Sequence, residues 1–233
     1  MYDLYVILFI LIAVLFSITT GKLTFGAAVL GGILSIIIFK GTGLTSLLML
    51  SAFFVLGSIA TSWRFEEKAS FRDGESKRRN GGQVWANAGM AAILACFAIF
   101  FSDCSDLLKC MIAGVFASAT ADTLSSELGN LYGKSFYNVI TLKRDKRGLD
   151  GVISLEGTLI GLVGSVIIAT IYSIANGWTV HFYWIIIAGT LGNFTDSFLG
   201  ASLERKNRIT NNTVNFLNTV SATFFIWLIQ IFS

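Results

Sequence analysis

The sequence is poor in charge and contains no proline, one histidine and three cysteines among its 233 residues. Charged residues form 13% of the chain, about half the share found in soluble domains. This composition excludes a freely soluble enzyme, a secreted disulfide scaffold and a nucleic-acid-binding domain. Because His181 supplies the one imidazole in the chain, neither a histidine metal cluster nor a Ser-His-Asp triad can be built.

Hydrophobic residues, in contrast, form 54% of the chain and are arranged in long continuous runs. A membrane β-barrel requires short segments of alternating polarity, and these runs do not have that pattern. The 23 glycines and 20 phenylalanines are typical of helices that pack closely in lipid. The sequence therefore predicts an all-α polytopic membrane protein, with residues 1–233 as a single integral domain in the lipid bilayer.

The apolar runs can be counted as membrane spans, since a bilayer core about 30 Å thick needs roughly 20 residues of helix. Eight spans are predicted, and seven is the alternative count. They cover residues 3–19, 24–40, 43–60, 84–101, 107–129, 152–175, 182–201 and 213–232. The first three spans form an N-terminal part over 1–60, and the later ones belong to a motif-bearing bundle over 79–220.

The basic residues indicate how these spans are oriented. Fifteen of the 17 lysines and arginines lie in the loops after the first, third, fifth and seventh spans, Arg72 in the third loop among them. Lys40 and Lys109 are the two that fall on the other side. Because basic loops stay on the cytoplasmic side, we expect these four loops in the cytoplasm and both termini outside.

Polar side chains within the spans gather at one depth of the membrane. Charges there cost about 2.5–3.5 kcal/mol on insertion scales, so each needs a partner or a function. In the predicted topology, the polar residues of spans four to eight lie near the cytoplasmic surface: Gln83, Asn87, Asp122, Glu127, Glu156, Asn193, Asp196, Asn212 and Asn215. The pattern predicts a polar pocket at the cytoplasmic ends of these spans. Structural ion pairs with loop arginines are the alternative interpretation of the carboxylates.

The residue types in this pocket favour a particular chemistry. Carboxylates and amides, without histidine or thiolate, suit a hard cation such as Mg²⁺. The adjacent segment 141–151 supplies Lys143, Arg144, Lys146 and Arg147, which can neutralise phosphate oxygens. Neither a P-loop pattern nor a protein-kinase glycine pattern occurs in the chain. The sequence therefore predicts magnesium and phosphate binding of a different kind.

Five sequence blocks carry a resemblance to a known family. They are RNGGQVWAN at 79–87, ATADTLSSELG at 119–129, GLDGVISLEGT at 148–158, GNFTDSFLGA at 192–201 and NNTVN at 211–215. Together they resemble the transmembrane protein 19 family, also called domain of unknown function 92, and the resemblance extends along the whole chain. Plant members of that family are phytyl-phosphate kinases. A distant likeness extends to dolichol kinase and CDP-diacylglycerol synthase.

The resemblance implies roles for individual residues. The residues implied to be catalytic are Asp122, Asp196, Lys143 and Arg144. Those implied to hold Mg²⁺ are Asp122, Asp196, Asn193, Asn215 and Glu127, and those implied to bind substrate are Arg79, Gln83, Asn87, Asp150, Ser154, Thr158, Ser197 and Asn212. Two positions depart from the family pattern, because Asn212 stands in place of an acidic residue and Glu156 in place of a small or apolar one.

The function expected on these grounds is that of a membrane-embedded prenyl-phosphate kinase. It transfers a phosphoryl group from a nucleoside triphosphate to an isoprenoid monophosphate, such as phytyl or geranylgeranyl phosphate. One alternative is a CTP-dependent cytidylyl transferase or another lipid-phosphate transferase, and a second is a lipid or small-solute transporter. A non-catalytic assembly protein is the third. A transporter is disfavoured because the outer halves of spans four to eight are nearly all apolar.

Overall fold

The computed structural model describes residues 2–70 and 77–232, and Arg72 lies outside them. Eight long helices occupy the eight predicted positions in this part of the chain. They are α1 (Tyr2–Thr19), α2 (Phe25–Thr42), α3 (Leu44–Ser62), α5 (Gly81–Phe100), α6 (Ser105–Tyr132), α7 (Leu155–Asn176), α8 (His181–Ser202) and α9 (Asn211–Phe232). The prediction of an all-α polytopic membrane fold is confirmed.

Six of these helices are long and apolar enough to cross a membrane, namely α2, α3, α5, α6, α7 and α9. Helix α1 is also apolar, but its apolar stretch Asp3–Thr19 is just too short to be counted with them. Helix α8 has 22 residues, and polar side chains such as Asn193 and Asp196 lower its mean hydropathy. Six helices therefore meet the requirements for spanning a membrane on length and composition, and the crossings by α1 and α8 stay a prediction.

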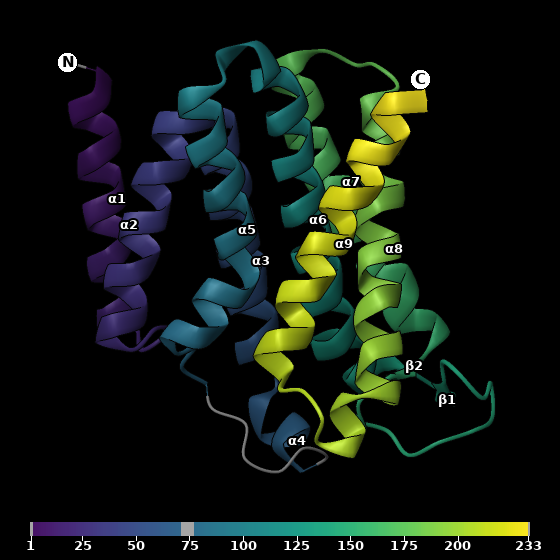
Figure 1. Ribbon diagram of the computed structural model, residues 1–233. Helices are drawn as coiled ribbons and strands as arrows, with labels where there is room; N and C mark the ends of the chain where they lie inside the picture. The colour runs from purple at the N-terminus through teal and green to yellow at the C-terminus, as the bar shows by residue number, and fades with distance from the viewer. Residues whose placement is uncertain (1, 71–76, 233) are drawn as a thin grey trace.

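The long helices run side by side, so the connections gather at two ends of the bundle (Figure 1). Both chain termini lie at one end. The short helix α4 (Phe65–Ala69) and the antiparallel strands β1 (Tyr137–Asn138) and β2 (Val152–Ile153) lie at the other. We call the end that carries α4 and the strands the hairpin end. The termini are thus placed together, as an even number of crossings requires, and the side of the membrane that each end faces stays a prediction.

The start of the sixth predicted span differs from the expected helix. Residues 152–153 form β2, and α7 begins only at Leu155, with the Ser154 hydroxyl as its N-cap. Gly151 adopts a left-handed φ of 69°, which favours glycine, and its carbonyl accepts a hydrogen bond from the Val139 N–H at 3.0 Å. The backbone groups of this segment are therefore satisfied by a hairpin, which an apolar run alone does not reveal.

Helix α6 is the centre of the bundle and packs against α3, α5, α7, α8 and α9. Ile112, Val115 and Phe116 in its first half are fully buried. The neighbouring helices approach it through glycines: a Cβ added at Gly161 of α7 or Gly189 of α8 would lie 3.0 or 2.7 Å from α6 atoms. Small residues allow this approach in lipid, and it places the second half of α6 between α7 and α8.

The outer surface of the bundle is strongly apolar. Phe25, Leu155 and Ile174 are each at least 70% exposed, and many other large apolar side chains of the long helices are exposed as well. A surface of this kind is unfavourable in water and is stable against acyl chains. Seven of the nine polar residues predicted to form a pocket line a cavity at the hairpin end of the bundle, whereas Glu156 and Asn212 do not.

Candidate functional site

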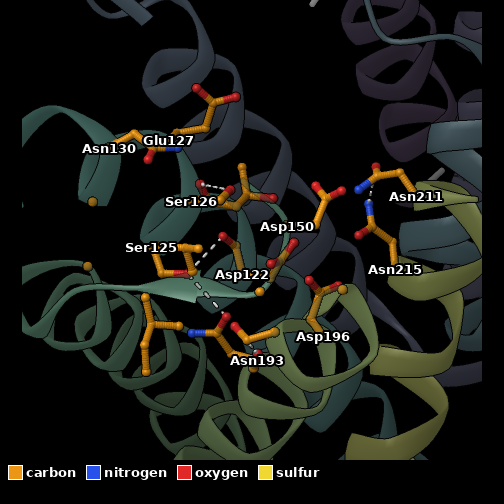
Figure 2. A pocket seen from close by; sticks show the side chains of 18 of the residues that line it. Asp122, Ser125, Ser126, Glu127, Asn130, Asp150, Asn193, Asp196, Asn211 and Asn215 are labelled. Carbon is orange, nitrogen blue, oxygen red and sulfur yellow. Dashed lines mark hydrogen bonds between the residues drawn. The ribbon is translucent and has the colours of Figure 1, made fainter. Parts of the chain in front are cut away.

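A polar cavity of about 670 Å³ opens at the hairpin end, where α6 and α8 end and α5, α7 and α9 begin. Twelve of the predicted site residues line it: Arg79, Gln83, Asn87, Asp122, Glu127, Asp150, Ser154, Thr158, Asn193, Asp196, Ser197 and Asn215. Figure 2 shows Asp122, Asp150 and Asp196 converging on this cavity from three parts of the chain. The predicted pocket on spans four to eight is therefore present in the structure.

Asp122 on α6 and Asp196 on α8 face each other within hydrogen-bonding reach. Two ionised carboxylates at such a separation repel strongly away from water, so a proton or a cation must lie between them. Gly192 and Gly189 allow this approach, because side chains there would overlap atoms of α6. The pair is the chemical centre of the cavity.

Two amides stand beside the carboxyl pair. The Ser125 hydroxyl donates to Asn193 Oδ1 at 3.1 Å, so this oxygen is held in place and keeps one free acceptor direction. Asn215 donates through Nδ2 to Asn211 Oδ1 at 3.4 Å, which leaves the Asn215 carbonyl oxygen for the cavity. Both oxygens are ligands that a hard cation accepts. Within residues 2–70 and 77–232, no group of three or more His, Cys, Asp or Glu side chains is placed to hold a metal.

Glu127, predicted as a further metal ligand, binds side chains of α3 and α4. Its Oε2 forms a buried ion pair with the Lys68 ammonium of α4, and its Oε1 accepts from the Thr61 hydroxyl of α3 at 3.1 Å. Lys68 also donates to the carbonyls of Ala60 and Thr61 at 2.7 and 2.9 Å. The structural ion pair considered for the carboxylates therefore applies to Glu127, although the partner is a lysine from α4.

The basic residues that line the described part of the cavity are Arg78 and Arg79. The Arg79 guanidinium lies over the ring of Phe53, 5.4 Å from its centroid, and against Gly57, where a Cβ would be 2.6 Å from Nη2. Arg79 thereby brings a positive charge into the cavity from the segment before α5. Lys143 and Arg144, in contrast, are exposed on the hairpin loop and are not among the lining residues.

A glycine-rich turn leads from the hairpin into α7 and lines the cavity from Gly148 to Ser154. Gly148 and Gly151 both adopt left-handed φ angles, and Gly151 packs so closely on α8 that a Cβ would lie 2.4 Å from the Ser197 carbonyl oxygen. The helix that follows presents its N-terminal turn to the cavity through Gly157 and Thr158. Glycine-rich turns before helix N-termini are common binding elements for phosphate.

Arg205, from the connection after α8, holds this hairpin in place. It donates through Nη1 to Asp145 Oδ2 at 2.7 Å and through Nη2 to the Asp150 carbonyl at 2.5 Å. The hydrogen bond from Arg205, with a second from the Lys146 N–H, lowers the pKa of Asp145. Fixing the Asp150 carbonyl leaves the Asp150 carboxylate directed to the cavity (Figure 2).

Helix α5 contributes two amides with different functions. Gln83 and Asn80 form a capping box, with hydrogen bonds of 2.9 and 3.1 Å, so Gln83 stabilises the start of α5. Asn87 is 7% exposed and donates through Nδ2 to the Gln83 carbonyl at 2.8 Å. Its Oδ1 has no protein partner in the described structure and lies in the cavity wall. A buried acceptor of this kind calls for a bound donor or cation.

The remaining predicted residue, Asn212, is not among the lining residues; its amide packs against Gly82 at the start of α5. Sequence reasoning did not assign Lys68, Thr61 or Arg78 to the site. Arg78 is adjacent to a predicted residue and could have been included on that ground. Lys68 and Thr61 lie outside the sequence blocks, and no sequence signal connects them to the cavity.

The helical bundle, its lipid-facing surface and the cavity define an integral multi-pass membrane protein with a polar site at one end. The chain belongs to the family described as integral membrane protein DUF92, whose profile matches residues 8–223. No solved structure matches the chain significantly.

Three relatives show the range of this similarity. Protein VTE6, chloroplastic, of Arabidopsis thaliana is 28% identical over 86% of this chain and 63% of its own length. An uncharacterized membrane protein of Synechocystis sp. is 32% identical over 80% of this chain and 74% of its own. An uncharacterized membrane protein of Methanocaldococcus jannaschii is 31% identical over 81% of this chain and 77% of its own length. The chain therefore spans under two thirds of the Arabidopsis protein and about three quarters of the other two.

Proposed function

We propose that the protein is a membrane-embedded prenyl-phosphate kinase, which transfers a phosphoryl group from a nucleoside triphosphate to an isoprenoid monophosphate. The observation that carries this proposal is the facing pair Asp122 and Asp196 in one cavity with Arg79 and the glycine-rich turn. The cavity thus combines a site for a cation with donors for phosphate oxygens. Phosphoryl transfer requires mainly positioning and charge stabilisation, which such an arrangement provides.

The donor set fits magnesium. It consists of carboxylate and amide oxygens, and neither histidine nor cysteine occurs among the described lining residues. Asp122 and Asp196 would hold the cation, with Asn193 and Asn215 as further oxygen ligands. When bound, magnesium neutralises negative charge on the phosphates. Because no group of three or more acidic side chains in the described part of the chain is placed to hold a metal, phosphate oxygens and water are expected to complete the coordination.

The phosphates are expected between Arg79 and the start of α7. Arg79 would neutralise the lipid phosphate, and the turn from Gly148 to Gly151 would approach the nucleotide phosphates through its backbone. An oxygen of the prenyl monophosphate attacks the γ-phosphorus of the nucleotide, and the bond from that phosphorus to the β-bridging oxygen breaks. The products are a prenyl diphosphate and a nucleoside diphosphate.

The apolar part of the cavity wall supports a lipid substrate. Phe136, Leu149, Val152, Ile153 and Phe194 line it beside the polar residues. Phe194 is also 38% exposed on α8. An isoprenoid chain is expected to lie against these apolar residues while its phosphate stays in the polar part.

The family supports the same substrate class. The sequence blocks resemble a family whose plant members are phytyl-phosphate kinases, and all five blocks contribute residues that line the cavity. Two features disfavour a transporter. The described lining reaches no deeper than Asn87, Asp122, Asn193 and Asn215, and Phe116 is fully buried beyond them. Nucleotidyl transfer, as in a cytidylyl transferase, uses similar groups, and the experiment below distinguishes it from phosphoryl transfer.

The test uses the purified full chain in detergent with Mg²⁺, each of the four nucleoside triphosphates, and phytyl or geranylgeranyl monophosphate. Label at the γ-phosphate should enter the lipid, the product should have the mass of a prenyl diphosphate, and Asp122→Asn should give none. Transfer of label from the α-phosphate would identify a nucleotidyl transferase instead. Absence of lipid product with every nucleotide and both prenyl phosphates would overturn the proposal.

A further inference from the structure

Deeper in the bundle than the carboxyl pair, a fully buried amide connects three helices. Asn218 of α9 is 1% exposed and sits between α6 and α8. Its Oδ1 accepts a hydrogen bond from the Ser118 hydroxyl of α6, and its Nδ2 donates to Asp196 Oδ2 of α8 at 3.4 Å. A buried amide without partners is costly, and here both of its ends are used. The chain of contacts thus runs from Ser118 through Asn218 to one of the paired carboxylates.

The order of these contacts fixes the orientation of the amide. A hydroxyl that donates to the Asn218 carbonyl oxygen holds the NH₂ group towards Asp196, whereas the flipped amide would set a carbonyl oxygen against a carboxylate. Ser118 reaches this position because Gly192 of α8 has no side chain. A Cβ at Gly192 would lie 2.0 Å from Ser118 Oγ and 3.1 Å from Asn218 Oδ1. Three helices therefore contribute to one hydrogen-bonded unit.

This unit determines how Asp196 presents its oxygens. Because Oδ2 accepts from the buried amide, this contact favours one orientation of the carboxylate in the cavity. Partners behind a metal-binding carboxylate orient it and stabilise its charge, and their removal typically lowers metal affinity about 10- to 100-fold. Neither Ser118 nor Asn218 lines the cavity, so neither is expected to touch a substrate.

We propose that Ser118 and Asn218 are positioning residues of the magnesium site, with Ser118 orienting the amide and Asn218 holding Asp196. This inference rests on the proposed function, since it concerns the cation site on which that function depends. It adds that cation affinity is set by two buried polar residues outside the cavity. Ser118 acts through Asn218, so replacing both should cost little more than replacing Asn218 alone.

The experiment measures Mn²⁺ binding by electron paramagnetic resonance on the purified protein, without nucleotide, as a readout independent of turnover. Ser118→Ala and Asn218→Leu are each expected to weaken Mn²⁺ binding about 10- to 100-fold. The Mg²⁺ concentration for half-maximal activity should rise in parallel, with a smaller change of kcat. The double variant should match Asn218→Leu within about twofold, because the two residues act in one chain of contacts.

Ser165→Ala is the matched control, since this serine of α7 is also fully buried, contacts the Ala117 carbonyl at 3.5 Å and lies away from the cavity. It should leave Mn²⁺ affinity unchanged. If the Ser118 and Asn218 variants lose thermal stability but bind Mn²⁺ like the parent, the positioning role is wrong while the proposed function stands. If the parent itself binds no Mn²⁺, both the magnesium site and this inference are overturned.

Discussion

Lys68 on α4 and Glu127 on α6 form a buried ion pair although 59 residues separate them in the chain. The Lys68 side chain is 2% exposed, and two backbone carbonyls at the end of α3 accept its remaining protons. The pair ties α3 and α4 to the cavity wall. Glu127 and Arg79 both line the cavity, where they bring charges of opposite sign.

Breaking this pair from one side should destabilise the fold. Lys68→Met leaves a buried carboxylate and Glu127→Gln leaves a buried ammonium, so each is expected to cost about 3–5 kcal/mol of unfolding free energy. The combined Lys68→Met and Glu127→Leu replacement should recover part of the loss, because no unpaired charge remains. Reversible unfolding in mixed micelles measures these differences. Single variants as stable as the parent would show that the pair does not support the fold.

The paired carboxyl groups should behave differently from Glu127. Asp122→Asn and Asp196→Asn keep the side-chain shape but remove charge from the proposed cation site. Each should lower turnover by more than about 100-fold, beyond the usual effect of residues behind a metal site. Unfolding should be little affected, because the repulsion between the two groups is also removed. The outcome against this prediction is near-parental turnover with an unchanged Mg²⁺ dependence.

Replacing the arginine in the cavity and replacing the cations on the hairpin loop should have kinetic effects that depend differently on salt concentration. Arg79→Met removes a charge from the cavity wall and should raise the KM for prenyl phosphate about tenfold at any ionic strength. Lys143→Gln with Arg144→Gln removes two exposed charges, which can only attract the nucleotide from a distance. Its effect should therefore disappear above about 0.5 M salt, where the Debye length is a few ångströms. If this double variant loses activity to the same extent at every salt concentration, Lys143 and Arg144 bind phosphate directly.

The sequence predicted most of the fold because long apolar runs and basic loops are governed by the membrane. It also placed Asp122, Asn193 and Asp196 at one depth, since helix direction alone decides which end of a span a residue occupies. The partners of these residues were beyond prediction. Lys68 reaches Glu127 from a short helix with no apolar periodicity, and the hairpin depends on left-handed backbone at Gly148 and Gly151. Such contacts arise from packing between distant segments, which the local pattern does not encode.

The link between Arg205 and Asp145 makes docking of the hairpin sensitive to acid. The Arg205 hydrogen bond lowers the pKa of Asp145 in the folded protein. The stability that this bond contributes is therefore fully present above the pKa of Asp145 in the unfolded chain, about 3.9, and is lost as the pH falls through the pKa in the folded protein. Protection of the Val139 and Asp145 amides from hydrogen exchange, corrected for intrinsic rates, should fall in that range. In Arg205→Met the protection should be low already at neutral pH, and a parental profile in this variant would contradict the prediction.

Orientation in the membrane decides whether the cavity meets cytoplasmic nucleotides, and two exposed asparagines at opposite ends of the bundle can report it. Asn207 lies beside the cavity end, and Asn176 at the end that carries the termini. In a background with Cys104→Ser, because Cys104 is exposed, a cysteine at 176 should react with an impermeant thiol reagent in intact cells, and one at 207 only after lysis. The excess of basic residues at the hairpin end is the physical reason, since positively charged loops are retained in the cytoplasm. Labelling at 207 in sealed cells would place the cavity outside, where nucleoside triphosphates are scarce, and the kinase proposal would then lose its phosphoryl donor.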